Sequence, residues 1–586
     1  MKPSFDIIEK EREPRPAERL QRQRTPGVRV ILVLLVVVYA LYCYVLSKPL
    51  LAHPLPRHTG PYAVGTVDIE TPISPPRTIH EARFRETGEK AFELKSVLFS
   101  LYYPASHAAA MSGHPRRHPW VPEPLALRAQ GYAKAARISN RFTDKLFTFV
   151  LNALVGDITI PATVDAPLSD PITRTSQDGA LERTSEHEGN RAPTSLGNEE
   201  SLSPDNGFPV IIFSHGTVSS RTDYSHFAGE LAARGHVVVM MEHRDGSCPG
   251  TVIRQHPEVP NRTQLLFDVA AVEMPDRQLS LTVEEFHEAQ LAFRQAEMEE
   301  AVRVLRRIVD AGEGVAVHAQ NPFGEGADLA RWGSKNAGEE ESRQGRRRIN
   351  THSMVVAGHS YGATGALRAL RGGPTHALPF HGAIALDPGK QSGPLNHDLR
   401  VPLLVVHSDS WSRPGTNRSS SSSTKGSGAS GMLYGAEGRA HFDVVRDIAA
   451  GANARGHPAW FMTSIGTSHP SVTDAPLLEP TLLRFTTGAT IDVYQGLRQY
   501  VHVADDFLAF LAGGRPRGLL AEKAEFPQYD PGAAGAAAAL LGVGKPGQGG
   551  RKSRGFVEDL RRGEWTDWKR YWQIHVSPAG NADEKE

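Results

Sequence analysis

Apolar runs alternate with amphipathic segments through the middle of the chain. Six runs of five or six residues are almost continuously apolar, as strands covered on both faces are; they occupy residues 209–214, 236–241, 353–357, 382–386, 402–406 and 459–463. Helix-like segments lie among them, with apolar residues spaced as on one face of a helix; they are residues 224–234, 291–309, 363–370 and 493–512. This alternation predicts βαβ units and a mostly parallel central sheet flanked by helices on both faces.

Upstream of this block the pattern is less regular, and three polar stretches interrupt the chain. Residues 60–104 carry strand signals, and residues 132–155 have apolar positions at helical spacing. The polar stretches lack any apolar period, so we expect them to be disordered insertions; they lie near 168–207, 321–347 and 413–432. Residues 60–515 are predicted to form one domain around them.

The N-terminus contains a candidate membrane span. Residues 30–46 (VILVLLVVVYALYCYVL) are seventeen uncharged residues, just long enough to cross a bilayer as a helix. Residues 1–29 form a basic tail with eight basic and five acidic residues, which favours a cytoplasmic N-terminus and a lumenal or extracellular remainder. The long basic region and the missing Ala-x-Ala site disfavour a cleaved signal peptide. We therefore predict a single-pass signal anchor, followed by a Pro-rich linker at 47–59.

Composition narrows the classes of function. The 65 basic and 65 acidic residues balance, so no nucleic-acid partner is favoured. Cys43 and Cys248 are the only cysteines, which leaves no disulfide framework and no cysteine-based metal site. Neither a His-Glu-x-x-His motif nor an acidic calcium loop occurs, so we expect no metal and no cofactor. Residues 516–586 are predicted to be an Ala/Gly-rich linker and a basic, aromatic tail.

The pentapeptide at residues 358–362, Gly-His-Ser-Tyr-Gly, joins a predicted strand to a predicted helix. The pattern alone is weak evidence, since a random chain of this length would hold roughly 0.4 copies. Its context is more informative. A nucleophile elbow needs a buried strand before the serine, small residues on both sides and a helix afterwards. All three surround Ser360, which is therefore the predicted nucleophile.

A serine nucleophile needs an imidazole to take its proton and a carboxylate to hold that imidazole. In an open parallel sheet such residues collect at the carboxyl ends of the strands. His469 lies in a Gly-Thr-Ser-His-Pro loop after the last of the six predicted strands and is the predicted base. Both Asp387 and Asp409 follow strands between Ser360 and His469, and spacing does not separate them. The order serine, acid, histidine is that of the α/β-hydrolase arrangement.

An oxyanion hole requires backbone N–H groups aimed at the charge that develops on the substrate. Tyr361 directly follows the nucleophile and supplies one such group. Thr217 follows the His215-Gly216 pair that ends the first central strand, and it is the second predicted donor. His215 itself is interpreted as a residue that shapes this turn rather than as a catalytic base.

Six separated stretches, spanning about residues 60–512, point to one family. They are GPYAVGTVD near residue 60, GDITIPATVDAPL from Gly156, FPVIIFSHGTVSSRTDYSHFAGELAARGHVVVMMEHRDGS from Phe208, VVAGHSYGATGAL, GAIALDP and GTSHPSVTDAP. Together they resemble the plasma and intracellular type II platelet-activating-factor acetylhydrolase family of the α/β-hydrolase superfamily. The combination of SHG, EHRD, GHSYG, ALDP and GTSH is far more specific than any one of these motifs.

The resemblance implies Asp387 as the acid, and hence a triad of Ser360, Asp387 and His469 with Thr217 and Tyr361 as oxyanion donors. Members of this family hydrolyse short or oxidised sn-2 acyl groups of phospholipids without calcium. A phospholipid substrate at a membrane surface is therefore implied. Pro388-Gly389 replaces the usual aromatic residue after the acid, and the insertions and the anchor are not features of the secreted relatives. These departures leave the acyl-chain preference and the lipid-surface contacts open.

Three hypotheses about function follow. The leading one is a membrane-anchored serine esterase that acts on phospholipid acyl groups. The second is a serine carboxylesterase of the same fold that acts on small soluble esters, and the third is a non-catalytic hydrolase fold used for binding. The complete set of Ser360, Asp387 and His469 argues against the third. The first two share a mechanism, so the triad does not distinguish them.

Overall fold

The computed structural model describes residues 34, 37–39, 41, 52–107, 116–171, 207–254, 259–275, 281–311, 318–319, 332, 348–413, 433–434, 439–532 and 568–579. The chain divides into two compact units, Met1–Leu51 and Ala52–Glu586. Five residues of the predicted span at 30–46 are described, and they are helical. Within the described parts of the chain, no helix combines the length and apolarity needed to cross a bilayer. The three predicted insertions lie almost entirely outside the described residues.

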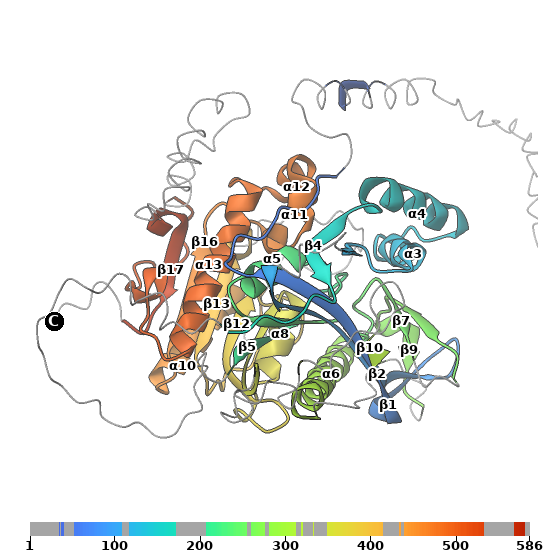
Figure 1. The fold of residues 1–586 in the computed structure, drawn as a ribbon, viewed down its shortest axis with the longest axis horizontal. Helices are drawn as coiled ribbons and strands as arrows, with labels where there is room; N and C mark the ends of the chain where they lie inside the picture. Colours follow the sequence, from blue (N-terminus) through green and yellow to red (C-terminus); the bar gives the residue numbers. More distant parts are fainter. Residues whose placement is uncertain are drawn as a thin grey trace, which may run out of the picture. The chain divides into compact units, whose positions relative to one another are not determined.

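A mixed sheet of 13 strands forms the centre of the second unit (Figure 1). Its strands lie in the order β17-β16-β13-β12-β11-β5-β6-β2-β1-β4-β3, and β9 and β10 also pair with β1. The strand bounds are β1 Ala63–Phe84, β2 Lys90–Ala105, β3 Arg117–Pro119, β4 Thr159–Val164, β5 Phe208–Ser214, β6 Val237–Met241, β9 Val272–Glu273, β10 His318–Ala319, β11 Ile349–His359, β12 Phe380–Leu386, β13 Leu403–Ser408, β16 Ala459–Ser464 and β17 Trp572–Val576. Two small hairpins lie apart from it, β7 (Gly250–Ile253) with β8 (Arg262–Leu265) and β14 (Leu433–Tyr434) with β15 (Arg439–Ala440).

The strands from β16 to β6 pair in parallel, and they are the six strands that the apolar runs predict. Their side chains alternate between two hydrophobic cores, because successive residues of a strand point to opposite faces. In β5, Val210 and Ile212 lie in one core, while Ile211 and Phe213 lie in the other. Burial on both faces explains why these runs are continuously apolar, and the prediction of a parallel block is confirmed.

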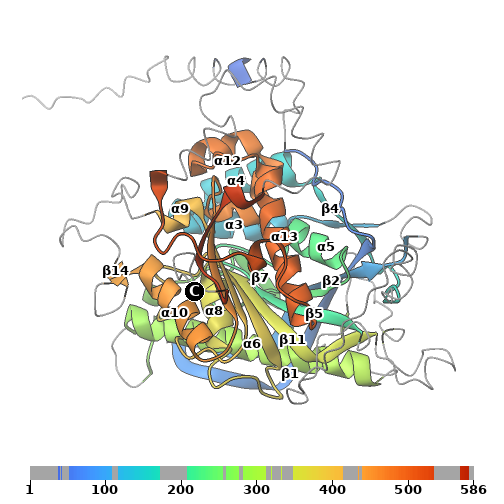
Figure 2. The same ribbon diagram turned by 90° about the vertical axis from the view of Figure 1, so that its left-hand side faces the viewer.

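Helices cover both faces of the parallel block (Figure 2). On one face pack α6 (Val283–Ala311), α8 (Tyr361–Arg368) and α10 (His441–Ala454); on the other pack α5 (Ser225–Ala232) and α13 (Val493–Leu511). Further α-helices among the described residues of the second unit are α3 (Leu125–Ala135), α4 (Arg141–Val155), α9 (Asp409–Ser412), α11 (Ala475–Leu478) and α12 (Pro480–Thr487). The helices predicted at 224–234, 291–309, 363–370 and 493–512 correspond to α5, α6, α8 and α13.

One predicted helical segment, residues 132–155, is in fact parts of two helices. Arg137 has a φ of 58°, which is outside the helical range, and it lies in the turn after α3. Asn140 then caps α4, because its side-chain oxygen accepts the N–H groups of Phe142 and Thr143 at 3.0 and 3.1 Å. Apolar spacing continues across this turn, so the pattern alone did not reveal the break.

Segments predicted to flank the domain are packed into it. Leu55, from the predicted Pro-rich linker, is buried in a hydrophobic core, and the Thr59 hydroxyl donates to Glu230 at 2.8 Å. At the other end, β17 pairs antiparallel with β16, so the prediction of only a linker and a tail at 516–586 is wrong for this segment. The basic and aromatic composition of the tail does not predict a strand. The strand forms because it pairs with β16, more than a hundred residues earlier in the chain.

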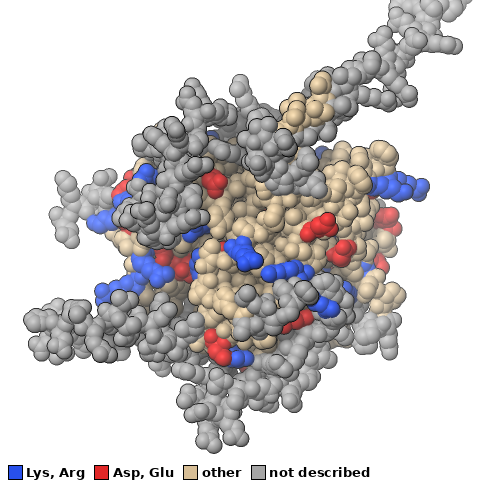
Figure 3. All heavy atoms as spheres, turned by 45° about the horizontal axis from the view of Figure 1, so that its top comes forward, with Lys and Arg blue, Asp and Glu red and all other residues tan. Residues whose placement is uncertain are grey.

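Charged side chains of both signs are interspersed on the face shown in Figure 3. Basic and acidic groups lie among wide uncharged areas there, in agreement with the equal numbers of the two in the sequence.

Candidate active site

Ser360 occupies the sharp turn between β11 and α8. Its φ of 56° and ψ of −123° are strained for a residue with a side chain. A Cβ on Gly362 would lie 1.9 Å from the carbonyl oxygen of Ser214, and one on Gly358 would lie 2.3 Å from that of Gly362. Only glycine fits at either position. The predicted strand, small flanking residues and helix are all present, and Ser360 is half-buried at their junction.

Asp387 and His469 meet at the same edge of the sheet. Asp387 directly follows β12 with a φ of 45°, and the residue is buried. Its carboxylate accepts the N–H of Ser408 at 2.6 Å, the hydroxyl of Ser408 at 2.7 Å and Nδ1 of His469 at 2.9 Å. The backbone N–H of Ser360 donates to Leu386, the neighbour of Asp387, at 2.9 Å. The serine turn, the acid and the histidine therefore lie together, although their strands are not consecutive in the sequence.

The His469 ring is enclosed by two aromatic neighbours. The Trp411 indole stacks on it with 3.9 Å between ring centroids and 11° between planes. The His359 ring lies 4.5 Å away at 36°. Burial, and then the neighbouring His469, hold the pKa of His359 well below its usual value. His359 is therefore a neutral neighbour of His469. The His469 side chain keeps 30% of its surface exposed.

Asp409, the other acid left open by the sequence, has different partners. It forms an ion pair with Arg413 at 3.1 Å, accepts the N–H of Gly466 at 3.0 Å and accepts the Tyr529 hydroxyl. Gly466 belongs to the loop that carries His469, so Asp409 braces this loop rather than the imidazole ring. Of the two carboxylates, the one that hydrogen-bonds His469 is Asp387, as the family resemblance implies.

One predicted oxyanion donor, Tyr361, belongs to the elbow itself, and the other, Thr217, belongs to a turn beside it. Tyr361 begins α8, so its N–H is one of the first-turn groups without an acceptor inside the helix. Thr217 is exposed and follows Gly216, where an added Cβ would lie 3.2 Å from the Cβ of Ser360. The turn that carries Thr217 therefore packs directly against the serine.

His215 is engaged in shaping this turn, in agreement with its interpretation from the sequence. Its Nε2 accepts the N–H of His243 at 3.1 Å, and Nδ1 lies 2.7 Å from the carbonyl oxygen of Gly216. Burial, followed by the nearby Arg294, lowers the pKa of His215 to about 4. Both ring nitrogens have backbone partners, so neither is available as a base.

A second serine–histidine–carboxylate set lies beneath that turn. Ser214 Oγ is 2.7 Å from Nε2 of His243, whose Nδ1 is 2.6 Å from Glu297. The distances match those of a catalytic triad, but at most 1% of any of the three residues is exposed. Arg294 adds a further hydrogen bond to Ser214 at 3.1 Å. A substrate has no access to this set, so its role is to hold the end of β5 against α6.

His359, Asp387 and His469 could also hold a cation, since one ligand atom from each lies within 4.8 Å of the others. The Asp387 carboxylate already accepts the hydroxyl of Ser408, and one of the two ring nitrogens of His359, Nδ1, lies 2.9 Å from the Tyr224 hydroxyl. The donors themselves are of the type that zinc binds. The geometry thus leaves a metal-dependent alternative to be tested by experiment.

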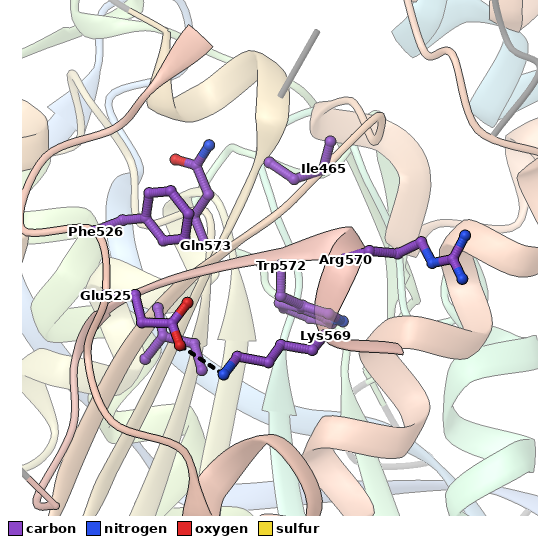
Figure 4. A pocket seen from close by; sticks show the side chains of 8 residues that line it. Ile465, Glu525, Phe526, Lys569, Arg570, Trp572 and Gln573 are labelled. Carbon is purple, nitrogen blue, oxygen red and sulfur yellow. Dashed lines mark ion pairs between the residues drawn. The ribbon is translucent and has the colours of Figure 1, made fainter. Parts of the chain in front are cut away.

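A cavity of about 310 Å³ lies at the edge of the sheet beside β17 (Figure 4). Its lining includes Ile465, Phe526 and Trp572, and the ion pair between Lys569 and Glu525 lies at it. Neither the predicted triad nor the predicted oxyanion residues line this cavity. One of its lining residues, Ile465, directly precedes Gly466 of the histidine loop, and its N–H donates to the carbonyl oxygen of Tyr571 at 2.7 Å.

Sequence reasoning missed three contributors to the site. They are Trp411, which stacks on the imidazole, Ser408, which hydrogen-bonds the acid, and Tyr529, which braces Asp409. Ser408 is the last residue of β13 and Trp411 follows three positions later, but a place at a strand end assigns neither of them a partner. Tyr529 lies in the predicted tail, where no local pattern marks it.

Comparison with known proteins identifies a family. The sequence model of the family described as "Platelet-activating factor acetylhydrolase, isoform II" matches residues 187–532, which is more than half of the chain. The matched region includes the elbow, Asp387, the histidine loop and both predicted oxyanion residues.

Individual relatives match shorter regions. A "Putative phospholipase A2" of Schizosaccharomyces pombe is 37% identical over 163 residues, 27% of this chain and 34% of that protein. Platelet-activating factor acetylhydrolase of Cavia porcellus is 25% identical over 61% of this chain and 60% of its own length. That of Gallus gallus is 22% identical over 61% of this chain and 66% of its own length. The chain thus spans between about a third and two thirds of these relatives. Among solved structures, a ferulic acid esterase from Streptomyces cinnamoneus superposes on 80% of this chain and 94% of its own chain. The sequence identity is 15% and the TM-score is 0.41.

Proposed function

We propose that this chain, which belongs to the platelet-activating factor acetylhydrolase, isoform II family, is a serine esterase that cleaves the sn-2 acyl ester of phospholipids. The observation that carries the proposal is the hydrogen bond between Asp387 and His469 beside a serine held in a strained elbow. Relatives named as acetylhydrolases and as a phospholipase A2 support the choice of ester.

In this proposal Ser360 Oγ attacks the acyl carbonyl while Nε2 of His469 takes its proton. Asp387 holds Nδ1–H, which fixes the tautomer and stabilises the imidazolium that forms. The N–H groups of Thr217 and Tyr361 stabilise the negative charge on the former carbonyl oxygen. His469 then returns the proton to the leaving lysophospholipid oxygen. Water, deprotonated by the same imidazole, releases the free acid from Ser360.

An apolar face on α4 supports a lipid surface as the place of action. Phe142 and Phe149 are 75% and 71% exposed, and Leu146 and Val150 are exposed beside them. These positions recur at helical spacing, so they lie on one side of α4. Exposed cations lie on α4 and just before it in the chain, at Lys134, Arg137, Arg141 and Lys145. Exposed apolar groups bordered by basic residues are typical of helices that lie in a membrane interface. The anchor at 30–46 would add a second membrane contact, and protease protection in sealed microsomes would test its topology.

The proposed substrate class predicts a strong dependence on acyl length. We expect sn-2 acetyl phospholipid to be cleaved at least tenfold faster than its long-chain counterpart. Each methylene that leaves the bilayer costs about 0.8 kcal/mol unless the protein buries it. The measurement is kcat/KM on a series of phosphatidylcholines that differ only in the sn-2 chain, with Ser360→Ala as the blank. Equal rates on acetyl and long-chain substrates would refute this preference, and rapid cleavage of soluble esters alone would favour the carboxylesterase hypothesis.

Chelation is expected to leave activity unchanged. Backbone donors stabilise the oxyanion in the proposed mechanism, and the imidazole activates the serine without a Lewis acid. The measurement is ester hydrolysis after prolonged incubation with EDTA and dialysis, beside an untreated sample. Activity that disappears on chelation and returns with added zinc or calcium would instead assign His359, Asp387 and His469 to a metal centre.

A further inference from the structure

Lys390 is a cation without an acidic partner close to the candidate active site. It lies three residues after Asp387 and is half-buried. Within the described part of the chain, no carboxylate lies within ion-pair distance of its ammonium group. Burial lowers the pKa of Lys390, and the charge of Asp387 acts in the opposite direction. Because burying an unpaired ammonium costs free energy, a position of this kind is a candidate for binding an anion.

The indole of Trp411 connects this cation to the catalytic histidine. Lys390 Nζ lies 4.5 Å from the centroid of the Trp411 ring, where the π-system attracts a positive charge. The same indole stacks on His469 at 3.9 Å, and its N–H donates to Pro388 at 2.9 Å. The two ring distances together place Nζ no more than 8.4 Å from the centre of the imidazole.

The segment that carries Lys390 is fixed by the helix of the elbow. The hydroxyl of Thr364, in α8, accepts the N–H of Gly389 at 3.2 Å and lies 2.8 Å from the hydroxyl of Ser392. These bonds bracket Lys390 on both sides. The position of its backbone therefore depends on the same helix that presents Ser360.

The other titratable groups nearby do not neutralise this charge. His407 and His441 are kept neutral, because burial and then their neighbours lower the pKa of His407 well below its usual value and that of His441 to about 3. The Asp387 carboxylate is occupied by His469 and Ser408. Lys390 is thus the cation nearest to the site in this group of residues.

We propose that Lys390 binds an anionic group of the substrate, a phosphate or a carboxylate, carried close to the scissile ester. The proposal rests on the esterase function above and deepens it. In a phospholipid the phosphodiester is only a few bonds from the sn-2 oxygen that His469 protonates. This separation is compatible with the distance of at most 8.4 Å between Lys390 Nζ and the centre of the imidazole. An acyl chain that ends in a carboxylate could bring the same chemistry from the opposite side of the ester.

The test compares three esters on the full chain. They are a neutral p-nitrophenyl acetate, a 1-alkyl-2-acetylglycerophosphocholine, and a p-nitrophenyl ester whose acyl chain ends in a carboxylate. We expect Lys390→Gln to lower kcat/KM about tenfold for one of the two esters that carry an anionic group, the phosphate of the zwitterionic lipid or the terminal carboxylate, and to leave p-nitrophenyl acetate within twofold. The ester that loses rate identifies the source of the anion. Lys390→Arg should retain most of the anionic preference, and Lys523→Gln, which removes an exposed lysine elsewhere, should change nothing.

Other outcomes would contradict either the role of Lys390 or the esterase function itself. Equal losses on all three esters, or no loss on any, would overturn the role of Lys390 while leaving the esterase intact. Absence of hydrolysis of every ester by the unaltered chain would refute the proposed function itself. Added salt should weaken the anionic preference of the unaltered chain and have little effect on Lys390→Gln, since screening acts on the charge that the variant lacks.

Discussion

Ser360→Ala is expected to abolish ester hydrolysis, with a loss of kcat on the order of 10⁶-fold, because loss of the nucleophile of a serine hydrolase leaves only binding and oxyanion stabilisation. The fold should persist. Alanine keeps the Cβ that the elbow already accommodates at a φ of 56°, and the turn is held by the Ser360 N–H, which the substitution does not alter. The two measurements are covalent labelling by a fluorophosphonate probe and turnover of an sn-2 acetyl phospholipid.

Ser214→Ala is the matched control for this experiment. Ser214 belongs to the buried set with His243 and Glu297, which has triad distances but no access. Its loss should decrease the free energy of unfolding by about 1–3 kcal/mol, since two buried hydrogen-bonding groups lose a partner, and labelling should persist. Undiminished labelling of Ser360→Ala would remove Ser360 from the mechanism.

Asp387→Asn should lower kcat on the order of 10⁴-fold, the loss seen when a triad aspartate becomes an amide and the histidine takes the wrong tautomer. The environment of Asp387 strengthens this expectation. The N–H of Ser408 donates to one carboxylate oxygen at 2.6 Å, and its hydroxyl donates to the other at 2.7 Å. An amide NH₂ placed there would face a donor. The measurement is kcat on a saturating ester, together with the free energy of unfolding.

Asp409→Asn is the comparison that decides the acid. Its carboxylate contacts Arg413, Tyr529 and the Gly466 N–H, so the substitution should loosen the histidine loop without altering the tautomer of His469. We expect a loss of kcat of about tenfold, accompanied by decreased stability. A larger loss of kcat for Asp409→Asn than for Asp387→Asn would show that the acid is misassigned.

The sequence was informative where a feature is local. Continuous apolar runs predicted the six neighbouring strands from β16 to β6, because strands buried on both faces must be apolar throughout. The elbow could be predicted because strand, glycines, serine and helix are contiguous. Glycines 358 and 362 are needed for close backbone contacts that any elbow of this shape makes.

What the sequence left open depends on contacts between distant residues. Asp387 and Asp409 both follow parallel strands, and only the hydrogen bond to His469 distinguishes them. Trp411 lies 58 positions before the ring on which it stacks, so no spacing rule connects the two. Strand β17 has a short, mixed sequence within a basic segment, and pairing with β16 rather than its own pattern makes it a strand.

The bracing of the histidine loop has a consequence for biosynthesis. The ribosome produces the proposed nucleophile, acid and base in that order, yet two of the braces of the histidine loop come later, at Tyr529 and at the carbonyl of Tyr571. When residue 469 has just been added to the nascent chain, all three proposed catalytic residues are present. The two supports at Tyr529 and Tyr571 have not yet been synthesised. The loop acquires its full set of contacts only when the last strand has been translated and has joined the sheet.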